Sequence, residues 1–281
     1  MKTKLLLLSI AALCLSVSPA FAATFGDGGA ALQKVLDDLT VPNPGGPSSI
    51  IVANNVELPD YLDSYWENTG SGSVSTLLFE LGAGFQNNFK FGVYDSLDSS
   101  NTLQVFPGSA SAGFARTLYV GAGGEVWLDY MNNIPGDPMS GLRTPDRIFP
   151  NQQYGFYLDS SGLTTGTSPD IGYGDMFYSD TSLNTTDLDG AGNPVDHMYA
   201  YQGVGDKMYI PTPTGTVEKT IGDDYYILTW EDLNASAGWT DRDYEDLVVL
   251  VESVEPIPVP GAVLLGLIGL GFAGRKLRKY A

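Results

Sequence analysis

Short apolar or alternating runs, separated by Gly, Asn, Asp and Ser, fill the chain from about Ser49 to Ser253. In the run from Phe89 to Tyr94, three apolar side chains fall on one side and Lys90 and Tyr94 on the other, which is the period of a half-buried strand. This pattern predicts a mainly β, antiparallel β-sandwich with jelly-roll-like connections over residues 49–255. The other runs of this kind are Val74 to Leu81, Val126 to Tyr130, Tyr154 to Leu158, His197 to Tyr201, Tyr225 to Trp230 and Leu247 to Val251.

One short helix is expected before the strands, within residues 23–48. Leu32, Val35, Leu36 and Leu39 recur at helical spacing and form one apolar face. The Pro- and Gly-rich stretch from Pro42 to Pro47 ends the helix. We expect this helix to cap the core of the β domain.

The first 22 residues have the pattern of a cleavable signal peptide. Lys2 and Lys4 precede an apolar run from Leu5 to Val17, and small residues follow it up to Ala22, after which cleavage is expected. Cleavage removes the only cysteine, Cys14, so the mature chain has no disulfide and no thiol chemistry.

The C-terminal residues 256–281 have a different composition and predict a transmembrane sorting helix. Pro256 and the prolines that follow it are expected to break any strand, and the apolar stretch from Ile257 to Gly274 is about 18 residues long, close to what a membrane span requires. The basic cluster that follows is expected to stay in the cytoplasm. It consists of Arg275, Lys276, Arg278 and Lys279.

Charge is separated along the chain. All 33 acidic residues lie between the two apolar ends, and only eight of the 14 basic residues accompany them, so the central domain is more acidic than the formal net charge of −19 indicates. Such a surface repels nucleic acid and attracts divalent cations, which excludes nucleic acid as a partner.

The tail resembles a known sorting signal. Pro258-Val259-Pro260, a Gly-rich apolar segment and the basic cluster from Arg275 to Lys279 together are similar to the PEP-CTERM signal, with Val259 where the name-giving motif has Glu. The resemblance implies an exosortase-type sorting enzyme as partner, passage through the inner membrane, and a final location at the cell surface or outside the cell. It also implies a link to exopolysaccharide.

The region before the tail resembles an uncharacterised bacterial extracellular β-rich domain that occurs in such proteins. The likeness is most specific in Trp230-Glu231-Asp232-Leu233 and in the segment from Asp241 to Leu247. Members of this type have no established catalytic activity, so the resemblance implies a non-enzymatic structural or interaction role. The other matching segments are Ser64 to Trp66, Phe91 to Asp95, Gly155 to Asp159 and Asp196 to Tyr201.

Two rival functions remain open. A Ser-His-Asp hydrolase would need His197, the only histidine, which we expect to be a packed or hydrogen-bonded strand residue. A glycoside hydrolase needs only two carboxylates, which this sequence neither identifies nor excludes. A carbohydrate-binding module would need exposed aromatic residues, whereas the four tryptophans, Trp66, Trp127, Trp230 and Trp239, are expected in the core.

Acidic residues around the last predicted strand indicate a calcium site. Asp241 and Asp243 alternate in a loop, Asp246 begins the strand, and Glu231 or Asp232 can close the site from the preceding strand. Calcium takes six to eight oxygen ligands, which such a group can supply, although the spacing is not that of an EF-hand. The alternative is that these acids cap turns and pair with Arg242 on a solvated loop, and the sequence leaves both interpretations open.

Overall fold

The computed structural model describes residues 29–40, 48–54, 58–70, 72–80, 89–128, 144–161, 175–212, 214–234 and 240–258. The predicted signal peptide, residues 1–22 with Ala22, lies outside the described residues. The tail lies outside as well from Val259 onward, including Pro260, Arg275, Lys276, Arg278 and Lys279. Within the described ranges, no helix has the length and apolar character needed to cross a bilayer.

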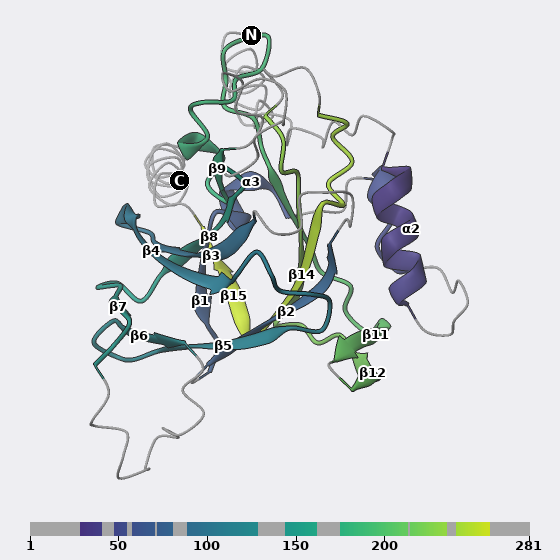
Figure 1. The fold of residues 1–281 in the computed structure, drawn as a ribbon, viewed down its shortest axis with the longest axis horizontal. Coiled ribbons are helices and arrows are strands. Elements are labelled where there is room, and N and C mark those ends of the chain that lie inside the picture. The colour runs from purple at the N-terminus through teal and green to yellow at the C-terminus, as the bar shows by residue number, and fades with distance from the viewer. Residues whose placement is uncertain are drawn as a thin grey trace, which may run out of the picture.

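Two large antiparallel sheets and one small hairpin form the domain, so the prediction of a mainly β, antiparallel fold is confirmed. One sheet has the order β15-β1-β8-β3-β4, with β9 paired to β8 (Figure 1). Its strands are β15 Val254–Ile257, β1 Tyr65–Asn68, β8 Tyr154–Asp159, β3 Lys90–Asp95, β4 Asp98–Phe106 and β9 Met176–Tyr178.

The other large sheet has the order β10-β13-β14-β2-β5-β6-β7. Its strands are β10 Met198–Tyr201, β13 Tyr225–Trp230, β14 Leu247–Glu252, β2 Ser73–Glu80, β5 Ala115–Val120, β6 Glu125–Leu128 and β7 Arg147–Ile148. The hairpin consists of β11 Lys207–Thr212 and β12 Gly215–Thr220.

Alternate residues of both large sheets build the main hydrophobic core. Trp66, Phe91 and Phe156 come from the first sheet, and Trp230 and Val249 come from the second; each is at most 1% exposed. These large rings sit at the centre because alternate side chains of each strand point to the same face, where they leave water together.

A second core lies on the other face of the larger sheet. The helix α2, Ala30–Leu39, runs beside β14 with the β11–β12 hairpin nearby (Figure 1). Its buried residues Leu32, Val35 and Leu36 join Ile227 of β13 in one cluster, with Leu39 packed against it. The expectation that this helix caps the core is therefore confirmed, and β10, β13 and β14 are buried on both faces.

Short helices connect some of these elements: α3 Asp60–Asp63, η1 Val52–Asn54 and η2 Thr181–Leu183. On the outer face of the first sheet, Tyr94 lies opposite Gly155 and Tyr157 lies opposite Gly92. Each tyrosine ring covers the glycine across the strand pair, where a Cβ atom would collide with it. Tyr94 is therefore fully buried, although it is on the opposite face from Phe91.

The expectation that Pro256 breaks any strand is wrong. Pro256 belongs to β15 and pairs with Trp66 of β1, and Ile257 pairs with Tyr65. β15 is the edge of its sheet, so proline's missing N–H leaves no neighbouring strand without a donor. The predicted domain boundary at residue 255 therefore cuts this strand, and the described fold continues to Pro258.

Candidate metal centre

Strand register brings together acids that are separated in the sequence. Trp230, the last residue of β13, pairs with Leu247, the first residue of β14. Glu231 and Asp246 are the next residue beyond each of these partners, so they leave the sheet side by side. The backbone N–H of Asp232 donates a hydrogen bond of 3.0 Å to the Oδ2 atom of Asp246, which closes this junction.

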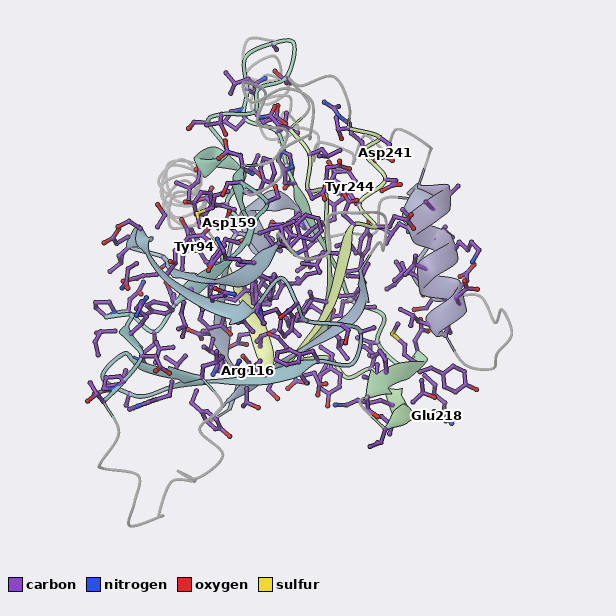
Figure 2. All side chains as sticks on the ribbon, in the orientation of Figure 1. Tyr94, Arg116, Asp159, Glu218, Asp241 and Tyr244 are labelled. Carbon is purple, nitrogen blue, oxygen red and sulfur yellow. The ribbon has the colours of Figure 1, made fainter. Side chains whose placement is uncertain are left out.

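The loop before β14 turns twice through left-handed backbone conformations. Arg242 has a φ of 53° and Tyr244 a φ of 59°, values that non-glycine residues adopt rarely and that cluster at functional sites. Tyr244 anchors the loop, because its ring lies 4.2 Å from that of Tyr199 and its hydroxyl donates to the Asp196 carbonyl at 2.9 Å. Figure 2 shows Asp241 and Tyr244 on the side of the molecule where α2 lies, away from Tyr94 and Asp159.

Three carboxylates converge at this junction. One oxygen each from Glu231, Asp243 and Asp246 lies within 4.8 Å of the other two. The three side chains are 2%, 8% and 9% exposed, so all are largely removed from water. A cluster of buried carboxylates repels itself unless protons or a cation neutralise it.

Glu231 carries the most informative atom of the cluster. Its Oε1 accepts a hydrogen bond of 2.7 Å from Thr240 Oγ1, whereas its Oε2 is buried and has no hydrogen-bond partner among the described residues. A buried polar atom without a partner is uncommon, and a bound ion or water is one explanation for it.

The environment raises the pKa of several of these carboxyl groups. Burial, followed by the charge of Asp246, raises the pKa of Glu231 to about 8. Burial and the charge of Glu231 raise the pKa of Asp232 to about 7, and burial with the charge of Asp232 raises the pKa of Asp246 well above its ordinary value. Burial is the largest cause of each rise in pKa. It acts by removing water from the carboxyl group, which disfavours the ionised form.

The structure separates the five predicted ligands into two groups. Glu231, Asp243 and Asp246 form the cluster, and Asp232 lies directly beside it, 2% exposed. Asp241 is exposed and acts from outside, where its charge adds to the rise in the pKa of Glu231. The alternative of turn-capping acids on a solvated loop fits in part, because Asp243 Oδ1 accepts a hydrogen bond of 3.2 Å from the Glu245 N–H, but Asp243 and Asp246 are buried rather than solvated.

The chemistry of the donors favours a hard cation. The cluster offers carboxylate oxygens, and the chain's single histidine and single cysteine exclude the two-histidine and multiple-thiolate sites typical of zinc. The group can therefore hold a divalent metal ion with oxygen ligands.

His197 belongs to this centre, a role that the sequence reasoning did not assign. It is buried and hydrogen-bonded, as predicted, but it lies one residue before β10 rather than within it. Its Nδ1 lies 3.1 Å from the Glu231 carbonyl oxygen, and its Nε2 lies 3.0 Å from Asp187 Oδ2. The pairing of Met198 with Trp230 places His197 opposite Glu231, and only that register could have revealed the contact.

The four tryptophans differ in burial. Trp66 and Trp230 are 0% exposed in the main core, as expected, and Trp127 is half-buried in β6. Trp239 lies outside the described residues.

Comparison of the chain with protein-family models, curated proteins and solved structures finds no match in any of the three.

Proposed function

We propose that this protein is an exported, non-enzymatic component of the bacterial cell surface or extracellular matrix, whose β domain binds a calcium ion at Glu231, Asp243 and Asp246. The observation that carries the calcium site is the buried Oε2 of Glu231, which has no hydrogen-bond partner among the described residues, in a side chain that converges with two further buried carboxylates. The ion supplies the positive charge that balances these carboxylates.

Calcium suits the donor set better than magnesium does. Calcium accepts six to eight oxygens in flexible geometry, so carboxylates and neighbouring carbonyls of an irregular loop can surround it. Magnesium requires a regular octahedron and releases its waters reluctantly. Calcium sites of extracellular modules have dissociation constants of about 10⁻⁴–10⁻³ M, which is the affinity we expect here.

The ion's proposed role is structural. It joins the end of β13 to the start of β14 and fixes the loop that carries Arg242 and Tyr244 in strained conformations. A ligand that binds only the folded state stabilises it by about 2.7 kcal/mol at a hundredfold excess over its dissociation constant.

The surface role rests on the chain's ends and on its charge. The signal-like residues 1–22 and the tail similar to PEP-CTERM support export and exosortase sorting. In this proposal the tail contains a membrane helix, and a jelly-roll-like sandwich lies between the signal and the tail. The acidic domain would approach an anionic exopolysaccharide only through bridging cations, which connects calcium to the matrix role.

A carbohydrate-binding module is the second candidate, and the burial of Trp66 and Trp230 removes two of its possible stacking residues. Titration calorimetry of the full chain tests the first proposal. We expect calcium to bind with one site per chain and magnesium to bind much more weakly. The absence of a heat of binding at millimolar calcium would contradict the site, whereas binding to soluble polysaccharides without calcium would favour the module.

A further inference from the structure

The backbone of Glu231 is held from both sides by one residue. The N–H of Glu231 donates to the His197 carbonyl at 3.0 Å, and the Glu231 carbonyl faces His197 Nδ1 at 3.1 Å. A carbonyl oxygen can only accept, so Nδ1 carries the proton in this contact. The carbonyl and the imidazole of His197 therefore hold the N–H and the carbonyl of Glu231, respectively.

The imidazole itself has little freedom. It is 1% exposed and stacks on the Phe177 ring, with centroids 3.6 Å apart and planes inclined by 11°. Its Nε2 contacts Asp187, which is 0% exposed and whose backbone carbonyl accepts from the Val195 N–H at 3.0 Å. Restraints from β9 and from the segment around Asp187 thus converge on a single ring.

These backbone contacts also restrain the side chain of Glu231. Thr240 is the only residue that hydrogen-bonds its carboxylate in the described structure, and it binds Oε1, whereas Oε2 has no hydrogen-bond partner there. The position of Oε2 therefore depends on two restraints, the Thr240 hydrogen bond and the fixed backbone of Glu231.

We propose that His197, held by Asp187 and Phe177, is a positioning residue that fixes Glu231 for the cation, so that affinity depends on contacts outside the coordination sphere. This inference rests on the proposed calcium site. Groups that orient metal ligands from outside the coordination sphere typically change metal affinity by about 10–100-fold when they are replaced.

Two matched substitutions of His197 separate its two contacts. The side-chain amide of His197→Asn lies close to the position of Nδ1 and keeps a donor for the Glu231 carbonyl. The longer side chain of His197→Gln reaches towards Asp187, as Nε2 does, and loses the Glu231 contact. Both variants lose the imidazole ring that stacks on Phe177, so we expect both to have a lower melting temperature in chelator.

Calcium calorimetry on the full-length variants gives the decisive readout, since a purely structural role would affect both variants alike. We expect His197→Asn to bind calcium nearly as well as the unaltered protein and His197→Gln to bind about 10–100-fold more weakly. Equal affinities of the two variants would overturn the inference while leaving the calcium site intact. If the unaltered protein binds no calcium, the proposed function fails and the inference fails with it.

Hydrogen exchange on the unaltered protein provides a second test that needs no variant to fold. Coupling between two sites is reciprocal. If the contacts of His197 with Asp187 and Phe177 strengthen calcium binding, calcium should stabilise those contacts in return. We expect calcium to slow exchange of the Val195 amide by about tenfold and to leave the β11–β12 amides unchanged. Unchanged exchange at Val195, with slowed exchange at Asp232, would overturn the inference.

Discussion

Asp246 accepts a hydrogen bond of 3.0 Å from the backbone N–H of Asp232, across the junction between β13 and β14. This contact follows from the pairing of Trp230 with Leu247, which sets two acidic segments side by side. Because Asp243 is also buried beside Glu231 and Asp246, the cluster depends on strand register as much as on composition.

Replacing one carboxylate should have opposite effects on the calcium-free and the calcium-bound protein. Glu231→Gln removes a buried ionisable carboxyl group and keeps an acceptor for Thr240 Oγ1, so we expect the melting temperature in chelator to stay the same or rise. The gain in melting temperature on adding calcium should disappear. A variant that still gains as much as the unaltered protein would show that Glu231 is not a ligand.

The raised pKa values predict how stability depends on pH in chelator. Since the pKa of Glu231 rises from 4.5 in the unfolded chain to about 8 in the fold, its favourable contribution is fully present below 4.5 and is lost as the pH approaches 8. Unfolding free energy should therefore decrease across this window, by about 1.4 kcal/mol per pH unit for one such group. Denaturant unfolding at several pH values checks this slope.

Two comparisons support the assignment of that slope. Glu231→Gln should flatten it, and saturating calcium should flatten it too, because the ion binds the deprotonated form. Asp98→Asn is the matched control, since Asp98 is an exposed residue at the start of β4. A slope that Glu231→Gln leaves unchanged would place the titrating groups elsewhere.

The last strand predicts where the tail can be removed without damage. Deleting residues 259–281 should release the protein into the medium with its melting temperature unchanged, because β15 stays whole. A chain that ends at Glu255 loses the pairs of Trp66 with Pro256 and Tyr65 with Ile257, and should be less stable by about 1 kcal/mol or more. Cell fractionation and melting curves of both truncations test this, and retention of the shorter deletion on cells would contradict it.

The packing of α2 on the larger sheet can be tested with one leucine. Leu36 is 0% exposed in the second core, so Leu36→Ala should destabilise the fold by about 2–5 kcal/mol. Leu97→Ala, at a position that is 69% exposed, should change stability by less than about 0.5 kcal/mol. Similar losses in both variants would mean that the helix does not cover the sheet.

The sequence predicts local elements well because their signals are local. The spacing of Leu32, Val35 and Leu36 indicates α2, and the apolar run from Leu247 to Val251 indicates β14, although only the structure shows that this strand is buried on both faces. Pro256 misled the prediction because proline is excluded only from central strands, and edge position depends on the order of the sheet.

The metal centre could be predicted only in part for a similar reason. The alternating acids Asp241 and Asp243, with acids at the adjoining strand ends, indicated the site. The exposure of Asp241, which separates it from the buried cluster, was not evident from the sequence. The contact of His197 with Glu231 needs the register of β10 on β13, which is set by the packing of the whole sheet.

Melting curves of the full chain with calcium and with chelator, recorded for the unaltered protein, Asp243→Asn and Asp98→Asn, test directly whether calcium binds the buried cluster. Asp243 lies in the buried cluster, whereas Asp98 is exposed in a separate acidic turn. We expect calcium to raise the melting temperature of the unaltered protein and of Asp98→Asn but not that of Asp243→Asn. Identical melting temperatures with calcium and with chelator in the unaltered protein, or an equal rise in both variants, would refute calcium binding at this cluster.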